Sequence, residues 1–304
     1  SHSATTYTTT TNEADVSDAI AEALATGNPI VIESQTAASG NGTAFDGWAY
    51  GTIDLKDGWS LDAGNMKVPM TREWMINAEF QQAVERSYRG DLWGNTDGIA
   101  LNYQGDDLRV TGMFGNYTGA NSTYDTNESS YSLLGRLDYM FSGNWSQFDQ
   151  FTSANGAESG TLLGVALMRE DNGNDTPNAN NTWVNVDLQM QFGGSNLYAA
   201  YSHGDMDGTN SNPTNFTAQY AIYLEDDFEV FARFQEYDSD VENDDSVSVF
   251  AIGFNWYLSG QNCKWSTDFN WADDGMTQDV GSGWQASGAD NDQMMVRSQL
   301  QFYF

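Results

Sequence analysis

The last nine residues of the chain, 296–304, alternate strictly between two kinds of side chain. One face of an extended segment would carry Val296, Leu300, Phe302 and Phe304, and the other would carry Arg297, Gln299, Gln301 and Tyr303. This period of two predicts a β-strand with one face in an apolar phase and the other in water. A transmembrane barrel strand and a half-buried strand of a soluble sandwich share this pattern, so both remain open here.

The same alternation recurs along the chain at the length of a membrane-crossing strand. Val184, Val186 and Phe192, for example, interleave with Asn185 and Asp187. We predict thirteen strands, at roughly 45–55, 59–68, 98–104, 108–117, 129–141, 160–169, 183–192, 195–203, 215–225, 228–237, 246–258, 264–272 and 293–304. Aromatic residues concentrate near the strand ends, as the interfacial girdles of a transmembrane barrel require. Repetition therefore favours an all-β, transmembrane antiparallel β-barrel.

Composition agrees with strands rather than helices as the membrane-crossing elements. The chain has 30 Gly, 4 Pro, 13% aromatic residues and a mean hydropathy of −0.53. It contains no apolar run of about 18 residues, which excludes a membrane-spanning helix. Backbone groups in lipid must all be paired, so a strand protein can cross a membrane only as a closed sheet.

The predicted connections alternate between short and long, as in outer-membrane barrels with short periplasmic turns and long external loops. Short connections fall at 56–58, 105–107, 193–194, 226–227 and 259–262, and long ones at 69–97, 118–128, 170–182, 204–214, 238–245 and 273–292. The connection 142–159 is the exception, because it is long but falls on the periplasmic side. We interpret it as an insertion or a misplaced strand.

Thirteen strands are an odd number, whereas bacterial single-chain barrels are normally even. Residues 28–35 are the candidate for another strand, which gives fourteen. Val16, Ile20 and Leu24 have helical spacing and Gly27 supplies a stop, so a short periplasmic or lumen-docked helix is expected before it. We therefore divide the chain into an N-terminal segment, 1–27, and a barrel, 28–304.

The segment 61–73, Leu-Asp-Ala-Gly-Asn-Met-Lys-Val-Pro-Met-Thr-Arg-Glu, and the following 83–87, Ala-Val-Glu-Arg-Ser, resemble the phosphate-selective porin O/P family. Weaker similarity extends the resemblance over about 43–304. The resemblance implies a barrel of 16 strands, usually assembled as a homotrimer, with a long loop folded into the lumen. It also implies that lumen Lys and Arg residues attract phosphate or other anions. With the strand count above, we expect 14 to 16 strands.

Charge argues against assuming anion selectivity. The chain has 11 Lys plus Arg against 43 Asp plus Glu, a net charge of −32, and such a field concentrates cations. Most acidic residues lie in the predicted loops, where salt screens them within about 8 Å. Charged positions predicted to face the lumen are of both signs: Arg136, Asp138, Asp187, Glu229, Arg233, Lys264, Asp268 and Arg297. Side chains at the constriction set selectivity at close range.

The long segment 69–97, together with the strand end before it, is the candidate constriction. Its charged residues are Lys67, Arg72, Glu73, Glu79, Glu85, Arg86 and Arg89. Both signs on an infolded loop would produce a transverse field that orients polar solutes without excluding either sign. Alternatively, the arginines pair with the glutamates of the same segment and only pin the loop to the wall.

Two acidic segments supply oxygen ligands suited to Ca²⁺, and neither completes a calcium-loop signature. The candidate ligands are Asp171, Asp175, Asp238 and Asp240. The alternative is solvated loops that bind divalent cations diffusely or bridge to lipopolysaccharide. We predict no other cofactor, no catalytic residues and no nucleic-acid partner. The two histidines, His2 and His203, have no matching catalytic motif, and Cys263 is alone and cannot form an internal disulfide.

These features predict a diffusion porin of a Gram-negative outer membrane, a cation-tolerant channel that passes ions and small hydrophilic solutes. The sequence starts Ser1-His2-Ser3 and lacks the basic and apolar regions of a signal peptide, as expected for a processed protein. The alternative is a soluble or surface-attached acidic β-protein that binds carbohydrate. In that case tryptophans such as Trp48 and Trp145 would be stacking platforms.

Overall fold

The computed structural model describes residues 49–88, 94–116, 131–171, 180–207, 211–242, 246–273, 284 and 293–303. Its strands are β1 (Ala49–Lys56), β2 (Trp59–Lys67), β3 (Asn95–Gln104), β4 (Leu108–Gly115), β5 (Tyr131–Ser142), β6 (Gly160–Asp171), β7 (Asn180–Gln191), β8 (Ser195–Met206), β9 (Thr214–Glu225), β10 (Phe228–Asp238), β11 (Val247–Gln261), β12 (Cys263–Ala272) and β13 (Gln293–Phe302). The short helices are α2 (Arg72–Met75), η1 (Ala78–Phe80) and η2 (Trp145–Asp149).

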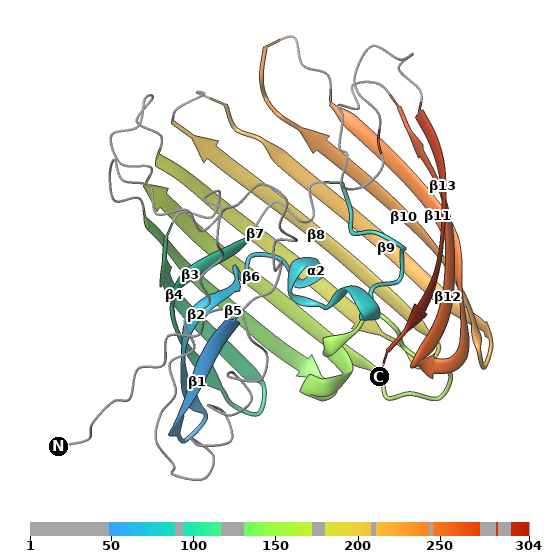
Figure 1. The fold of residues 1–304 in the computed structure, drawn as a ribbon, viewed down its shortest axis with the longest axis horizontal. Coiled ribbons are helices and arrows are strands. Elements are labelled where there is room, and N and C mark those ends of the chain that lie inside the picture. Colours follow the sequence, from blue (N-terminus) through green and yellow to red (C-terminus); the bar gives the residue numbers. More distant parts are fainter. Residues whose placement is uncertain are drawn as a thin grey trace, which may run out of the picture.

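All thirteen strands form one antiparallel sheet in which each strand pairs with its neighbours in sequence. The sheet curves around a hollow, with β1 and β13 as its two edges among the described residues (Figure 1). The all-β antiparallel fold and the thirteen expected strands are confirmed, with ends that differ by a few residues. The predicted helix in 1–27 and the extra strand at 28–35 lie outside the described residues.

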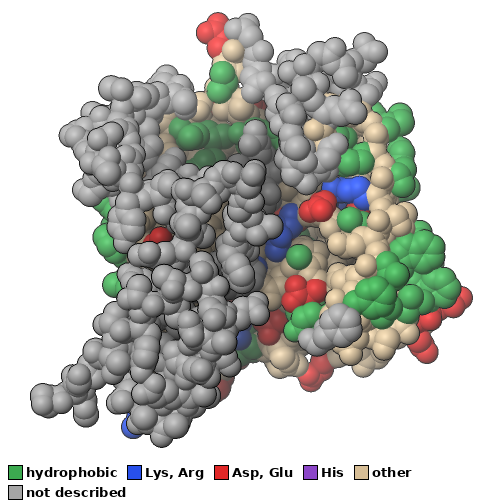
Figure 2. All heavy atoms as spheres, in the orientation of Figure 1, with side chains coloured by type: hydrophobic (Ala, Val, Ile, Leu, Met, Phe, Trp, Pro, Cys, Tyr) green, Lys and Arg blue, Asp and Glu red, His purple; other side chains and the backbone are tan. Residues whose placement is uncertain are grey.

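Exposure along the strands is the reverse of that in a soluble protein. On β7, Asn185 and Asp187 are 0% and 1% exposed, whereas Val184 and Val186 are 40% and 42% exposed. Further along the sheet, Ile252 on β11 is 61% exposed. Figure 2 shows charged side chains of both signs in the hollow and hydrophobic ones along the outer margin. Apolar side chains outside and polar ones inside are the arrangement of a transmembrane β-barrel.

Aromatic side chains form two rows across the outer faces of neighbouring strands. One row joins Phe216, Phe234, Phe250 and Trp271, with successive ring centroids 6.2, 4.8 and 5.8 Å apart. The other contains Phe228, Phe254, Trp265 and Trp256. The first row lies near the ends of β9–β12 that carry the long connections, and the second lies near the ends that carry the tight turns. Their positions match the two interfacial girdles of a membrane barrel.

Connections between strands differ at the two ends of the sheet. At the end called here the turn end, β1 and β2, β3 and β4, and β9 and β10 are joined by tight turns, as the sequence predicts. The β1–β2 turn has Lys56, Asp57 and Gly58 at φ 72°, 52° and 83°. A Cβ at Gly58 would overlap the carbonyl oxygen of Gln104, so only glycine fits that position. Long connections lie at the opposite, loop end.

The long connection 143–159 at the turn end is an insertion, and no strand is misplaced. It joins β5 to β6, contains η2 and packs inward, with Phe148 and Phe151 0% and 1% exposed. We call it the turn-end insert. Asn144 caps η2 with a capping box that includes Gln147, which fixes the start of the inward fold. No helix among the described residues is long and apolar enough to cross a membrane.

Candidate functional site

The described part of the connection between β2 and β3, residues 68–88, folds into the hollow of the sheet, and we call it the infolded loop (Figure 1). Pro69 cannot donate a ladder hydrogen bond, so β2 ends and the chain leaves the wall. Thr71 then caps α2 by accepting a hydrogen bond from the Trp74 amide at 3.1 Å. Val68 donates to the Gly94 carbonyl at 3.3 Å, which closes the base of the loop.

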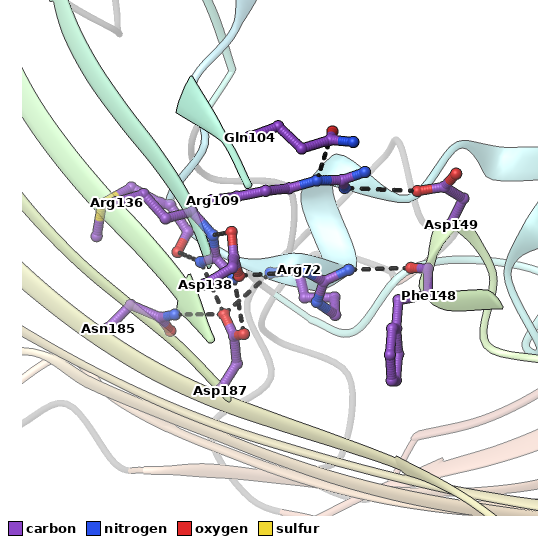
Figure 3. Close-up of polar contacts among 10 residues, drawn as sticks. Arg72, Gln104, Arg109, Arg136, Asp138, Phe148, Asp149, Asn185 and Asp187 are labelled. Atoms are coloured by element: carbon purple, nitrogen blue, oxygen red, sulfur yellow. Dashed lines mark hydrogen bonds and ion pairs between the residues drawn. The ribbon is translucent and has the colours of Figure 1, made fainter. Parts of the chain in front are cut away.

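A buried ionic cluster holds the start of this loop against β5 and β7 (Figure 3). The Arg136 guanidinium donates to Asp138 at 2.7 and 3.0 Å and to Asp187 at 2.8 and 2.9 Å. It also donates to the Met70 carbonyl at 2.8 Å. Arg72 adds a bond from Nη2 to Asp138 at 3.1 Å and one from its amide to Asp187 at 3.1 Å. Two guanidinium groups therefore face two carboxylates, and the cluster is neutral.

A second set of contacts holds the far part of the loop against the opposite wall. Lys264 on β12 donates to the carbonyls of Glu79 and Gln81 at 2.9 and 2.8 Å. Gln82 donates to the buried carboxylate of Glu229 on β10 at 3.0 Å. Further contacts of this kind include Arg233 with the Glu85 carbonyl at 2.9 Å and the Val84 amide with Asp268 at 2.9 Å. The loop therefore crosses the hollow and is fixed at both walls.

The turn-end insert lies against the infolded loop inside the sheet. Phe151 donates its amide to the Phe80 carbonyl at 3.3 Å, and Arg72 donates to the Phe148 carbonyl at 2.9 Å. Thr152 and Tyr257 share a hydrogen bond of 2.8 Å, so the insert also reaches β11. The two segments together fill the part of the hollow beside β6–β12.

Open space remains on the other side of the loop, along β2–β4. One cavity of about 550 Å³ reaches the turn end, where Gly58 and Gln104 line it. A second, of about 230 Å³, reaches toward the loop end, where Lys67 and Met113 line it. Six residues line both: Asp62, Pro69, Met75, Asn77, Asn102 and Thr111. The cavities therefore adjoin and mark a route along the inner wall, which we call the β2–β4 passage.

Of the six predicted constriction residues that the structure describes, two line this passage. Arg72 lines the larger cavity and Lys67 the smaller one, where its Nζ donates to Asn77 at 3.0 Å. Glu73 is buried, accepts hydrogen bonds from Ser87 and forms an ion pair with Arg233. The other three described residues hold the loop in place: Glu79 and Glu85 use their carbonyls as above, and Arg86 donates to the carbonyls of Glu73 and Ile76. Arg89 lies outside the described residues.

The suggestion that the loop's arginines pair with its own glutamates is wrong for Arg72 and Glu73. Arg72 pairs with Asp138 on β5 at 3.1 Å, and Glu73 is 3.6 Å from Arg233 on β10. All eight positions expected to face the lumen lie on the inner face of the sheet: Arg136, Asp138, Asp187, Glu229, Arg233, Lys264, Asp268 and Arg297. Seven contact the loop directly, and Arg297 is bonded to Asp268 at 3.0 Å. Their effect on selectivity stays a prediction.

Sequence reasoning missed Asp62, Asn102, Arg109 and Asp149, which line the larger cavity. The first three occupy inward positions of β2, β3 and β4, and the alternation in those strands could have identified them. Arg109 donates to Gln104 at 2.9 Å and lies 3.9 Å from Asp149 (Figure 3). Asp149 carried no such signal, because it belongs to the turn-end insert. Its side chain is 66% exposed to the open space, but the surrounding protein still desolvates the carboxyl in part, and this effect outweighs the attraction of Arg109 and Arg72 and raises the pKa of Asp149.

The calcium candidates show no assembled site in the described part of the chain, where no group of three or more His, Cys, Asp or Glu could hold a metal. Asp240 accepts two hydrogen bonds from Asn212 at 2.8 and 3.1 Å, and Asp238 accepts from the Asp240 amide. Asp175 lies outside the described residues. His203 is exposed on β8, and Cys263 is a partly buried free thiol at the start of β12.

No protein-family model and no curated protein matches the sequence, so the resemblance to the phosphate-selective porin O/P family is not confirmed. Similar solved structures include outer-membrane expressed OmpT of Vibrio cholerae, with 10% identity, a TM-score of 0.48, and coverage of 72% of this chain and 67% of that one. OccK5 (OpdH) of Pseudomonas aeruginosa has 12% identity, a TM-score of 0.48, and coverage of 84% and 70%. Acinetobacter baumannii OccAB3 has 9% identity and a TM-score of 0.45, and the match covers 73% of this chain and 60% of that one. This chain therefore spans less than two thirds of OccAB3.

Proposed function

We propose that the protein is a diffusion channel of a bacterial outer membrane, through which ions and small hydrophilic solutes pass along the β2–β4 passage. The observation that carries this proposal is the inverted exposure of the sheet. Ile252 and Leu224 are each 61% exposed on the outer face, while Glu229 and Asn255 are 0% exposed inside. Apolar surface of this extent costs free energy in water and lowers it in lipid.

The larger cavity of the passage is polar and electrically balanced, and Lys67 adds one positive group in the smaller cavity. A lining with groups of both signs supports weak ion selectivity. The positively charged residues that line the larger cavity are Arg72, Arg109 and Arg136. The negatively charged ones are Asp62, Asp138 and Asp149. Three positive and three negative groups give no net formal charge. The net charge of −32 over the whole chain concentrates cations near the entrances and makes the channel cation-tolerant.

A soluble carbohydrate-binding protein would require the opposite distribution of side chains. Trp145, one of the tryptophans that could have formed a sugar platform, instead donates its indole N–H to the Gly105 carbonyl at 2.9 Å and stacks under Arg109. Its ring is therefore occupied by protein contacts, which favours the channel over that alternative.

Single-channel recording in a planar bilayer under a KCl gradient tests the proposal. We expect discrete conductance steps and a reversal potential near zero or modestly on the cation side. The folded protein should also run faster on a gel before boiling than after it. A protein that stays soluble without detergent and produces no steps would overturn the channel. A strong anion-side potential with block by phosphate would retain the channel and overturn the predicted tolerance of cations.

Assembly as a homotrimer is part of the proposal only through the family resemblance. Contact with lipopolysaccharide and weak Ca²⁺ binding are proposed from the oxygen ligands of the acidic segments. Chemical cross-linking in detergent measures the assembly. A cross-linked species of three chains supports the trimer, and a monomer alone at all cross-linker concentrations contradicts it.

A further inference from the structure

Arg109 is the most loosely held of the three arginines that line the larger cavity. It rises from β4 and extends between Gln104 and Asp149, across the space above Arg72 (Figure 3). Its side chain is 29% exposed, whereas those of Arg72 and Arg136 are 8% and 4% exposed. Only one hydrogen bond shorter than 3.0 Å holds it, from Nε to Gln104. The guanidinium therefore keeps N–H donors available to a solute.

The other two arginines are committed to the architecture. Arg136 makes five hydrogen bonds, four of them to carboxylate oxygens. Arg72 bonds to Asp138 and to the Phe148 carbonyl. Removal of Arg136 would leave both Asp138 and Asp187 short of buried counter-charge, and removal of Arg72 would leave Asp138 short of it, so either change would destabilise the fold. A passing solute therefore gains little from these two groups.

Asp149 is the loose partner of Arg109. Its side chain is 66% exposed, and its Oδ1 lies 3.9 Å from Arg109 Nη1, at the limit of an ion pair. An exposed pair at this distance contributes little to stability, so it opens readily. The Trp145 ring, 4.2 Å from the Arg109 guanidinium, keeps the charge in position through a cation–π contact when the pair opens. The two charges thus stand side by side, each with unused hydrogen-bonding capacity.

We propose that the Arg109–Asp149 pair is the solute-selecting element of the passage and that it favours small zwitterions, solutes that carry a carboxylate and an ammonium group. This inference rests on the proposed channel function and specifies its substrate class. A zwitterion can open the weak pair and replace it with two new ones, its carboxylate on Arg109 and its ammonium on Asp149. A solute anion or cation satisfies one of the two groups and leaves the other without its partner. A neutral solute offers neither charge.

Selection by such a pair also suits rapid transport. The exchange trades one weak ion pair for two comparably weak ones, so the zwitterion gains entry without becoming trapped. The remaining lining groups near the exchange, Asn102, Gln104 and Thr111, are neutral hydrogen-bonding side chains that accept either end of the solute. Asp62, which also lines the larger cavity, already accepts hydrogen bonds from Thr52 and Asn102, so within that cavity the Arg109–Asp149 pair is the more available charged contact.

Swelling of liposomes that contain the full chain tests the proposal with two isomers, glycine as the zwitterion and glycolamide as the uncharged solute. We expect wild-type protein to pass glycine faster than glycolamide. The Arg109→Gln and Asp149→Asn variants should each lower the glycine-to-glycolamide ratio at least threefold. The double variant should lower it no further than the single ones, because both groups act on the same solute.

Matched controls remove one charge of the same sign from the outer surface. Arg169→Gln changes an exposed arginine of β6, and Asp106→Asn changes an exposed aspartate of the β3–β4 turn, so neither should alter the ratio. Gel mobility before and after boiling shows whether each variant folds. Should Arg109→Gln fold poorly, Arg109→Lys keeps the charge, and its ratio should stay closer to wild type.

The results separate this inference from the channel function on which it rests. If wild-type protein supports neither conductance nor swelling, the channel itself fails. If it conducts normally but Arg109→Gln and Asp149→Asn leave the ratio at the wild-type value, the zwitterion inference alone fails. Equal acceleration of both isomers would also overturn it, because the pair would then control only the width of the passage.

Discussion

Arg136 and Asp187 form a two-bonded ion pair across a strand that separates them. Arg136 lies on β5 and Asp187 on β7, and their guanidinium and carboxylate meet at 2.8 and 2.9 Å over Gly164 of β6. A Cβ at Gly164 would overlap Arg136 Nη2 and Asp187 Oδ1. The missing side chain at position 164 therefore makes room for the cluster that holds the infolded loop.

We expect Gly164→Ala to destabilise the protein and release the start of the loop. Breaking a buried, hydrogen-bonded charge pair costs about 3–5 kcal/mol, and the new methyl group also displaces Asp138. When the protein is folded into lipid vesicles and titrated with urea, the variant should unfold at a lower midpoint concentration of urea than wild type. Single-channel recording should show a larger, noisier conductance, because the loop no longer keeps one position in the hollow.

Gly135→Ala is the matched control for this change. Gly135 lies on the outer face of β5, where a Cβ would meet no atom within 4 Å. The control should keep both the wild-type midpoint and the wild-type conductance. Equal midpoints for Gly164→Ala and wild type would show that the ion cluster does not depend on the space above Gly164.

Lys264→Met should loosen the far side of the infolded loop without adding a clash. Methionine preserves much of the side-chain volume but removes the two donors that bind the carbonyls of Glu79 and Gln81. It also leaves Glu229 without a nearby positive charge. We expect a larger conductance and shorter-lived open levels in single-channel recordings, with Lys56→Met in the exposed β1–β2 turn as the control. An unchanged current trace would mean that Gln82, Arg233 and Asp268 are sufficient to hold the loop.

The sequence predicts the fold well because a barrel strand is decided by local alternation. Arg136 and Asp187 could be assigned to the inner face from their neighbours alone, since a shift of one residue would place both in lipid. The positions of Arg297 and Lys264 on the inner face follow from the same alternation along their strands. The infolded loop was expected from the family resemblance of residues 61–73 and 83–87, and the length and mixed charge of the segment after Pro69 made it the candidate constriction.

The passage itself was not predictable in this way. Arg109 and Asp149 meet only because the turn-end insert turns inward, and that fold depends on Phe151 packing against Ile76 and Tyr198, which are distant in sequence. Glu73 and Arg86 were expected in the constriction because of their charge. Their contacts with Ser87, Arg233 and backbone carbonyls use that charge to fix the loop instead. Charge alone does not distinguish an anchor from a solute contact.

As the pH is lowered, the preference for zwitterions should be lost at a higher pH than the usual pKa of an aspartate would predict. Partial desolvation by the surrounding protein raises the pKa of Asp149, although its side chain is largely exposed, so its carboxyl gains a proton earlier as the pH is lowered from neutrality. The neutral form no longer attracts an ammonium group, while glycine stays zwitterionic. Liposome swelling across a pH series should therefore show a declining glycine-to-glycolamide ratio in wild type. Asp149→Asn should give a flat, low ratio over the same range, and a parallel decline in that variant would assign the titration to another group.

Accessibility to a charged thiol reagent should distinguish the β2–β4 passage from the filled part of the hollow. In a Cys263→Ser background, Thr111→Cys places a thiol in the wall that both cavities share, whereas Gln219→Cys places one on β9 behind Gln82. A sulfonate-bearing methanethiosulfonate added to an open channel should react quickly with Cys at position 111 and reduce the current. It should react slowly or not at all at position 219, which is 4% exposed in the native protein. Rapid loss of current at position 219 with none at 111 would place the route between the infolded loop and β9–β12, and would overturn the assignment of the passage to β2–β4.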